Sequence, residues 1–406
     1  MKFARLVGYI IAAAGTIGLI KAPALAARKR ALKVFLATGR RYTFPATVKP
    51  RVSFIIPVYN GAHHTLACLL SILAVADGSY EVIVVDDGST VETAELLTYF
   101  ENVRVHKNSH NQGFLHSVNT GAALAQGQYL VLLNNDARLI KGSQSSALDR
   151  FEAEDNCGLM GARVRHVSGG LQEAGCIIYQ DGITNGYLRY EREDDLRALF
   201  QRDVDYCSGV FAIITRQQFE VLGGLDEAYA PSYFEETDLC MRLRESGLRC
   251  IYNPRLLVDH FEFGSSAKAQ SARKKIEMRR EVFLKRWSST LKQQRFYQTE
   301  ETKNIEAAAL RLTPHPRRLI VVNAKDVIAQ VEKRIQNKNY QTTIYVIDVS
   351  NQLMKLLVAK TDMSVAFAYG SERQLRRFIK RRRSFFDVFE VAEDVRTSLT
   401  DQLQKV

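Results

Sequence analysis

Short apolar runs rich in β-branched residues alternate with segments of helical spacing in the middle of the chain. Residues 52–56, 82–85 and 129–133 are such apolar runs. Between them, residues 66–75 and 118–125 repeat apolar positions every three or four residues, as an amphipathic helix does. Strands that alternate with helices are typical of a parallel sheet covered on both faces. The pattern therefore predicts an α/β fold with a mostly parallel sheet flanked by helices.

The pattern continues towards the C-terminus and then weakens. It predicts a strand at 210–215, a charged amphipathic helix at 237–246 that ends at Gly247, and a basic helix at 271–287. After a polar stretch, strands are expected at 319–322, 343–349, 365–369 and 388–391. We therefore expect a main domain over residues 49–292 and a small α/β domain of unknown role over residues 310–406.

Residues 1–48 differ from the rest. An uncharged apolar run covers residues 6–20, which is shorter than the ~20 residues that span a bilayer as a helix. A basic stretch, residues 28–30, follows it. The segment is either a membrane-associated helix with its basic flank on anionic headgroups or a helix packed on the main domain. We favour the first interpretation.

Composition excludes several classes of protein. Of the 406 residues, 46% are hydrophobic and 25% are charged, which is the mix of a globular protein rather than of a disordered chain, collagen or a polytopic membrane protein. The six cysteines form no CxxC pair, which argues against zinc-ribbon and thioredoxin-like sites and indicates reduced thiols in a cytoplasm. The net charge of +12 favours an anionic partner. No nucleic-acid-reading motif accompanies it, so we expect no nucleic-acid partner.

Polar side chains follow the first two predicted strands. Pro57 cannot donate a hydrogen bond to a sheet, so the first strand stops being regular there, and Tyr59 and Asn60 beyond it can line a planar base. Asp86 and Asp87 end the second strand. These carboxylates either bind a ligand, such as a ribose or a base N–H, or cap the helix that follows.

The third strand ends in Asn134, Asn135 and Asp136. A carboxylate beside a diphosphate can hold a divalent cation through its oxygens, although a single Asp in this position is commonly a turn residue. Because the carboxyl ends of parallel strands share one edge of the sheet, the three polar clusters are expected at one cleft.

A group of acids and one histidine complete the candidate chemistry. Glu235, Glu236 and Asp238 lie in the first turn of the charged helix, where they either stabilise the helix dipole or take part in catalysis. Close acids raise one another's pKa towards values useful for catalysis, which favours the second interpretation. His260 is either a metal ligand or a buried, hydrogen-bonded histidine.

Several of these strings, in the same order, resemble glycosyltransferase family 2 enzymes of the GT-A fold. Asn134 stands where that family has the first acid of its Asp-x-Asp motif, as in rhamnosyltransferase-like branches, and Glu236 stands where it has an Asp. The resemblance covers residues 52–291. The matching strings are Pro57-Val58-Tyr59-Asn60, Asp86-Asp87-Gly88-Ser89, Asn111-Gln112-Gly113-Phe114, Asn119-Thr120-Gly121, Asn134-Asn135-Asp136, Ser208-Gly209-Val210-Phe211, Gly223-Gly224-Leu225-Asp226-Glu227 and Glu235-Glu236-Thr237-Asp238-Leu239.

The resemblance implies a GT-A-type, Rossmann-like sheet and an inverting, metal-dependent glycosyltransferase of cell-surface polysaccharide biosynthesis. Its donor would be a nucleotide-diphosphate sugar, and its acceptor a saccharide or lipid-linked sugar at the cytoplasmic face of the plasma membrane, with peripheral contact to the inner membrane. Mg²⁺ or Mn²⁺ would be held by Asp136 and His260, and Glu236 would be the general base, with Asp238 and Glu235 as the other candidates. The donor would contact Pro57, Tyr59, Asn60, Asp86, Asp87, Asn111, Gly113, Asn119, Asn134 and Asn135.

Two other functions stay open. A sugar nucleotidyltransferase has a related sheet, but that class usually opens with a Gly-rich pyrophosphate loop, which is absent at Pro57. A non-catalytic, transferase-like scaffold of a polysaccharide assembly complex would explain the departures at Asn134 and Glu236.

Overall fold

The chain forms two compact units in the computed structural model. The first comprises Met1–Leu148, Asn156–Glu193 and Arg202–Leu312, and the second comprises Asp149–Asp155, Asp194–Gln201 and Thr313–Val406. The structure describes residues 21–140, 144–193, 195–262, 269–293, 296, 305–312, 318–321, 342–348, 353–369 and 388–391.

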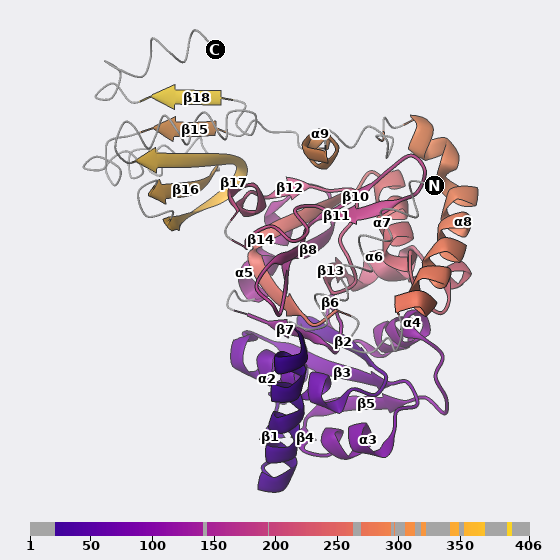
Figure 1. Cartoon of the computed structure of the whole chain (residues 1–406). Coiled ribbons are helices and arrows are strands. Elements are labelled where there is room, and N and C mark those ends of the chain that lie inside the picture. Colours follow the sequence, from indigo (N-terminus) through magenta and orange to yellow (C-terminus); the bar gives the residue numbers. More distant parts are fainter. Residues whose placement is uncertain are drawn as a thin grey trace. The chain divides into compact units, whose positions relative to one another are not determined.

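A ten-stranded mixed sheet forms the centre of the first unit (Figure 1). Its main path runs β12-β14-β8-β13-β6-β2-β3-β5, with β7 paired to β14 and β9 paired to β8. The strands are β2 (Val52–Val58), β3 (Tyr80–Asp86), β5 (Val103–Lys107), β6 (Tyr129–Leu133), β7 (Ala137–Leu139), β8 (Cys157–His166), β9 (Leu171–Ala174), β12 (Arg202–Asp203), β13 (Phe211–Thr215) and β14 (Arg249–His260). Two small two-stranded sheets join β1 (Tyr42–Thr43) to β4 (Phe100–Glu101) and β10 (Cys176–Ile178) to β11 (Thr184–Gly186).

The N-terminal half of this sheet is parallel, as the alternation of strands and helices predicts. Strands β6, β2, β3 and β5 run parallel to one another, and β14 is parallel to β8. Strand β13 lies antiparallel between β6 and β8. The predicted α/β class with a central, mostly parallel sheet is confirmed. The strands between residues 157 and 203 were not predicted, because their mixed polar pattern has no clear period of two.

Helices pack on this sheet because they present small or apolar residues to it. The helices with strong contacts to strands of this sheet are α2 (Ala62–Val75), α4 (Phe114–Leu124), α6 (Arg216–Val221) and α7 (Glu235–Glu245). The other helices of the described chain are residues 21–38, α3 (Val91–Leu97), α5 (Gln144–Ala153), α8 (Ala269–Gln293) and α9 (Ile305–Leu310), with short 3₁₀ turns η1 (Leu196–Leu199) and η2 (Glu227–Tyr229). Helix α4 lies on β2 and β3. A Cβ at Gly121 would lie 2.5 Å from Ile55 Cγ2, so this close packing requires glycine.

The helix at residues 21–38 belongs to the first unit and packs on other residues of it. Leu32 and Phe35 are buried, and the Phe35 ring stacks on Tyr42 and Phe100. This agrees with the second interpretation of the N-terminal segment for the part that the structure describes, whereas the apolar run at 6–20 lies outside the described residues. Within the described ranges, no helix combines the length and the apolar character needed to cross a membrane.

The second unit contains a four-stranded sheet in the order β16-β17-β15-β18. Its strands are β15 (Arg318–Val321), β16 (Thr342–Asp348), β17 (Leu353–Tyr369) and β18 (Val388–Val391). Strand β15 is parallel to both β17 and β18. All four predicted strands are present, but β17 begins well before residue 365.

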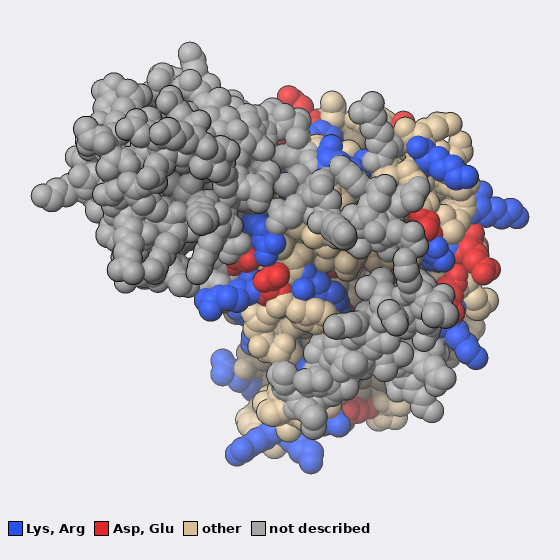
Figure 2. All heavy atoms as spheres, turned by 45° about the horizontal axis from the view of Figure 1, so that its top comes forward, with Lys and Arg blue, Asp and Glu red and all other residues tan. Residues whose placement is uncertain are grey.

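Positive charge is spread over the described surface. On the face shown in Figure 2, Lys and Arg side chains lie on several separate parts of the described surface, with Asp and Glu among them. The described part of this face therefore carries no continuous basic patch.

Candidate functional site

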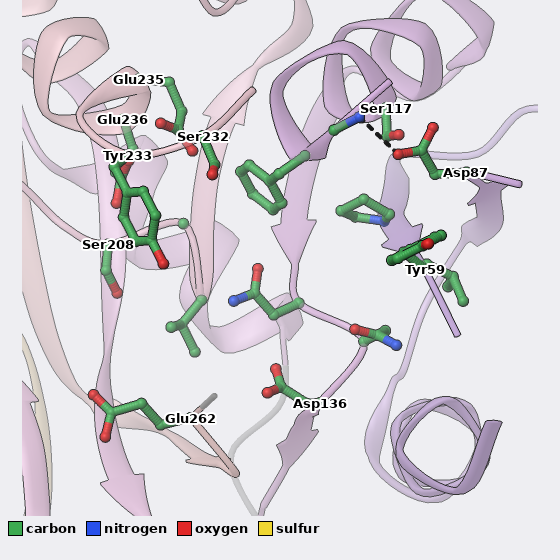
Figure 3. A pocket seen from close by; sticks show the side chains of 18 of the residues that line it. Tyr59, Asp87, Ser117, Asp136, Ser208, Ser232, Tyr233, Glu235, Glu236 and Glu262 are labelled. Atoms are coloured by element: carbon green, nitrogen blue, oxygen red, sulfur yellow. Dashed lines mark hydrogen bonds between the residues drawn. The ribbon is translucent and has the colours of Figure 1, made fainter. Parts of the chain in front are cut away.

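A pocket of about 790 Å³ opens at the carboxyl edge of the parallel strands. Eleven of the fifteen predicted site residues line it: Pro57, Tyr59, Asp87, Asn111, Gly113, Asn134, Asn135, Asp136, Glu235, Glu236 and His260. They come from the ends of β2, β3, β6 and β14, from the segment before α4 and from the first turn of α7. Figure 3 shows Tyr59 and Asp87 on one side and Tyr233, Glu235 and Glu236 on the other.

Asp136 and His260 meet because strand pairing places them side by side. In the antiparallel pair of β7 and β14, His260 lies opposite Ala137, the residue after Asp136. His260 Nε2 is 3.0 Å from Asp136 Oδ1, and His260 Nδ1 is 2.7 Å from Gln172 Oε1. Burial would raise the pKa of Asp136, but the charges of His260, His64 and Arg28 outweigh it and lower the pKa to about 2. Asp136 is therefore a buried carboxylate that stays ionised.

The two asparagines before Asp136 differ in their contacts. Asn135 Nδ2 donates a hydrogen bond to Thr65 Oγ1 at 3.0 Å. Asn134 lines the pocket, and its side-chain oxygen is buried without a hydrogen-bond partner among the described residues. Because an unsatisfied buried oxygen is costly, Asn134 is suited to accept a hydrogen bond from a ligand or to bind a cation.

Asp87 organises the loop before α4. Its Oδ1 accepts hydrogen bonds from Asn108 Nδ2 and Gln112 N at 2.8 and 2.9 Å, and its Oδ2 accepts one from Gly113 N at 2.8 Å. At Gly113, φ is 98° and a Cβ would lie 2.8 Å from Pro231 O, so only glycine fits. The Asp87 carboxylate thus holds the pocket wall in place, and the N-cap of α3 is Thr90 rather than Asp87.

Glu235 and Glu236 form the acidic wall. Neither carboxylate has a partner for its Oε2 atom within the described chain, and both Oε2 atoms are buried. Burial is the largest cause that raises the pKa of Glu236 to about 7, and the charge of Glu173 adds to it. Burial, followed by the charge of Glu236, raises the pKa of Glu235 well above its usual range. The pKa of Glu236 lies near neutral pH, where a carboxyl can accept a proton from a substrate, which makes Glu236 the better candidate base.

The backbone before α7 is strained. Tyr233 and Phe234 have φ values of 79° and 71°, which are unfavourable for residues with a Cβ. Phe234 is buried and contacts the Phe283 ring at a centroid distance of 5.2 Å. Packing of Phe234 thus holds the turn that directs Glu235 and Glu236 into the pocket.

Three predicted donor-binding residues do not line the pocket. Asn60 Oδ1 accepts a hydrogen bond from Thr90 N, and Asp86 Oδ1 accepts one from Ser89 N. Asn119 donates to Leu225 O at 2.8 Å and accepts from Leu225 N at 2.9 Å. These side chains fix loops around the pocket, so the structure gives them a supporting position rather than a ligand-facing one.

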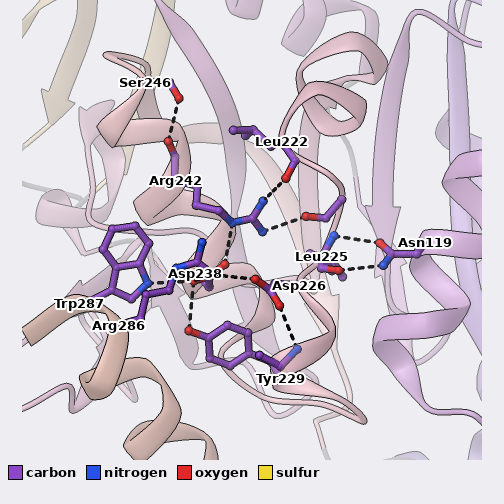
Figure 4. Close-up of polar contacts among 12 residues, drawn as sticks. Asn119, Leu222, Leu225, Asp226, Tyr229, Asp238, Arg242, Ser246, Arg286 and Trp287 are labelled. Atoms are coloured by element: carbon purple, nitrogen blue, oxygen red, sulfur yellow. Dashed lines mark hydrogen bonds and ion pairs between the residues drawn. The ribbon is translucent and has the colours of Figure 1, made fainter.

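Asp238, predicted as a candidate base, is the fourth predicted residue that does not line the pocket. Its side chain is fully buried. Oδ1 accepts hydrogen bonds from Tyr229 OH and Trp287 Nε1 at 3.1 and 2.8 Å, and Oδ2 accepts one from Arg242 Nε at 2.7 Å (Figure 4). All its acceptor sites are directed at residues of η2, α7 and α8, so Asp238 joins these elements instead of meeting a substrate.

Sequence reasoning missed several residues that line or support the pocket. Gln172 and Glu173 on β9 are buried polar residues, and Ser208 Oγ donates to Glu173 Oε1 at 2.5 Å. Tyr233 and Glu262 also line the pocket. Two adjacent polar residues in a strand that is buried at every position were a usable signal only once the strand itself was known.

Comparison with known families agrees with this geometry. Residues 53–223 match the family described as Glycosyl transferase family 2. The chain carries a family 2 glycosyl transferase domain. The matched range contains β2 to β13 and thus Asp87 and Asp136, but not Glu236 or His260.

Curated relatives share this domain over part of their length. An uncharacterized protein, y4gI, of Sinorhizobium fredii is 28% identical over 263 residues, which are 61% of this chain and 29% of that protein. The O-antigen biosynthesis protein RfbC of Myxococcus xanthus is 26% identical over 55% of this chain and 18% of its own length. The pre-mycofactocin glycosyltransferase of Mycobacterium tuberculosis is 27% identical over 52% of this chain and 42% of its own length. The chain spans less than half the length of these relatives.

Solved structures with a similar fold are more distant. The mannosyltransferase PcManGT of Pyrobaculum calidifontis, in complex with GDP-Man and Mn²⁺, is 16% identical with a TM-score of 0.40 over 79% of this chain and 93% of that chain. GalNAc-T7 with UDP, GalNAc and Mn²⁺ is 15% identical with a TM-score of 0.41 over 52% of this chain and 42% of that chain.

Replacing Asp238 should destabilise the fold. We expect Asp238→Asn to lower the free energy of unfolding by about 3–5 kcal/mol, because Arg242 would lose its buried carboxylate partner. Urea denaturation measures this change. Trp287→Phe, which removes one hydrogen bond to Asp238, should cost less, whereas an Asp238→Asn protein as stable as the wild type would contradict the role of Asp238 as a buried junction.

Replacing Glu236 should stabilise the protein at alkaline pH. A carboxyl whose pKa is raised in the folded state supports folding fully below its unfolded pKa and loses that contribution as pH rises through about 7. Glu236→Gln removes this loss, so we expect it to be more stable than the wild type by about 1–3 kcal/mol at pH 8 and by much less at pH 4.5. Denaturation at both pH values tests this, with the exposed Glu227→Gln as control; a stability difference independent of pH would contradict it.

Proposed function

We propose that the chain is an inverting glycosyltransferase that transfers a sugar from a nucleotide-diphosphate sugar to a saccharide or lipid-linked acceptor in polysaccharide biosynthesis. The observation that carries this proposal is the pairing of two different sites in one pocket. Asp136 and His260 offer a carboxylate and an imidazole on one side, and Glu236 offers a carboxylate of raised pKa on the other. A diphosphate leaving group needs charge stabilisation, which the Asp136 and His260 side can supply by holding a cation. An acceptor hydroxyl needs a base, which Glu236 can supply.

The donor side fits a divalent cation such as Mn²⁺ or Mg²⁺. Within the described residues, no three His, Cys, Asp or Glu side chains gather around one point that could hold a metal ion. Asp136, His260 and the unpartnered oxygen of Asn134 fit an ion that takes its remaining ligands from diphosphate oxygens and water, as Mg²⁺ sites commonly do. When bound, the cation would neutralise charge that develops on the leaving diphosphate.

The acceptor side supplies the proton transfer. The acceptor hydroxyl gives its proton to Glu236 while its oxygen bonds to the anomeric carbon. The bond from that carbon to the diphosphate oxygen breaks, and its electron pair leaves with the nucleoside diphosphate. One displacement of this kind inverts the anomeric centre. Glu235, whose pKa burial raises, can donate a hydrogen bond beside it when it is protonated.

The cellular setting is part of the same proposal. All six cysteines are free and buried, which is consistent with a reducing cytoplasm. The O-antigen biosynthesis protein among the relatives supports a role in surface polysaccharide assembly. We place the acceptor at the cytoplasmic face of the plasma membrane, where lipid-linked saccharides are extended.

The donor reaction tests the proposal directly. We expect release of nucleoside diphosphate from one member of a panel of UDP-, GDP- and dTDP-sugars, with Mn²⁺ or Mg²⁺ present and not with EDTA. Asp136→Ala should remove this turnover, while Asp149→Ala, which changes an exposed acid outside the pocket, should retain it. Full activity of Asp136→Ala would exclude the metal role. Folded wild-type protein that turns over none of these donors with saccharide or lipid-linked acceptors would favour the scaffold interpretation.

A pH profile tests the base. With a pKa of about 7 for Glu236, kcat/KM should fall about tenfold per pH unit below neutral pH, because the protonated acid cannot accept a proton. Glu236→Gln should lower kcat by about 10²–10⁴-fold and leave the Kd for the donor nearly unchanged. The measurements are initial rates between pH 5 and 9 and donor titrations. Equal losses in kcat and in donor affinity would point to a binding role for Glu236 instead.

A further inference from the structure

The helix at residues 21–38 reaches the candidate metal site from outside the family 2 match, which begins at residue 53. Two of its cations, Lys21 and Arg28, are seven residues apart and therefore lie on the same face of the helix. Neither residue lines the pocket. Any effect on the reaction must therefore pass through the residues that they hold.

Arg28 contacts both segments that carry the candidate metal ligands. Its Nη1 donates a hydrogen bond to the backbone oxygen of Asp136 at 3.3 Å and lies 2.7 Å from His64 Nδ1. Its guanidinium lies 5.0 Å from the centre of the Phe261 ring, which directly follows His260. Phe261 N also donates to Asp136 O at 3.2 Å. Arg28 thus closes a small network around the junction of β7 and β14.

Lys21 holds the next residues of the same segment. Its Nζ donates to the backbone oxygen of Glu262 at 3.1 Å and lies 3.8 Å from Glu262 Oε2. It also lies 5.8 Å from the centre of the Phe261 ring. Lys21 is 8% exposed, and a lysine is rarely buried to this extent unless it is paired. Lys21 and Arg28, two turns apart on one helix, therefore contact residues 261 and 262, which directly follow His260.

We propose that Lys21 and Arg28 are positioning residues of the metal site. The helix at residues 21–38 then contributes to the transfer reaction in addition to packing on the fold. This inference rests on the proposed function. Groups that orient metal ligands from behind typically change metal affinity or activity 10–100-fold when they are removed. Arg28 fixes the backbone of Asp136, and Lys21 fixes the strand end that carries His260, so their loss should loosen the pair that would bind the cation.

Binding of metal–nucleotide complexes, measured without turnover, tests this inference. The probes are Mn²⁺–UDP, Mn²⁺–GDP and Mn²⁺–dTDP in isothermal titration, with EDTA as the metal-free control. Arg28→Met should raise the Kd of the complex that the wild type binds by about tenfold or more. Arg28→Lys keeps the charge and a donor and should recover part of the affinity. Arg30→Met changes an exposed cation of the same helix and should bind as the wild type does.

A structural effect is separated from a positioning effect by the same variants. If Arg28→Met does not fold, Lys21→Met takes its place, with the same expected rise in Kd. A variant that loses thermal stability but keeps the wild-type Kd below its melting temperature would overturn the inference and leave the proposed function intact. Wild-type protein that binds none of the three Mn²⁺–nucleotide complexes would overturn the metal part of the proposed function and this inference with it.

Discussion

The antiparallel pairing of β7 with β14 is the constraint on which the candidate site depends. It sets His260 opposite Ala137 and so brings an imidazole within 3.0 Å of the Asp136 carboxylate. A shift of one residue in this register would turn His260 to the other face of the sheet. Gln172 on β9 and Arg28 on the N-terminal helix hold the pair from two further directions.

A second junction places the acidic wall. Asp238 ties η2, α7 and α8 together through Tyr229, Arg242 and Trp287. The strained turn at Tyr233 and Phe234 then directs Glu235 and Glu236 away from that junction and into the pocket. The three acids at the start of α7 therefore have different surroundings: Glu235 and Glu236 line the pocket, whereas Asp238 binds Tyr229, Arg242 and Trp287.

The acidic wall shows why a buried carboxyl of raised pKa lowers the stability of its own fold at neutral pH. A buried carboxylate with a pKa near 7 is a good base at neutral pH, but its ionisation is unfavourable in the folded protein. The strain before α7 adds to this. The surrounding apolar core, which includes the buried strand β2, supplies the stability that makes both features tolerable.

The sequence alone determined the α/β class and placed Asp87 and Asp136 just beyond the carboxyl ends of parallel strands, because apolar periodicity and parallel strand order depend on local residues. It did not predict that β2 continues through Pro57 to Val58. It could not separate Glu236 from Asp238, or Asp87 from Asp86, because both members of each pair belong to the same local motif. Only the tertiary structure decided which carboxylate faces the pocket and which binds Arg242. It also brought Gln172 to His260 and the helix at residues 21–38 to Asp136 and Phe261, because contacts between residues far apart in sequence depend on sheet register and helix packing, which local patterns do not encode.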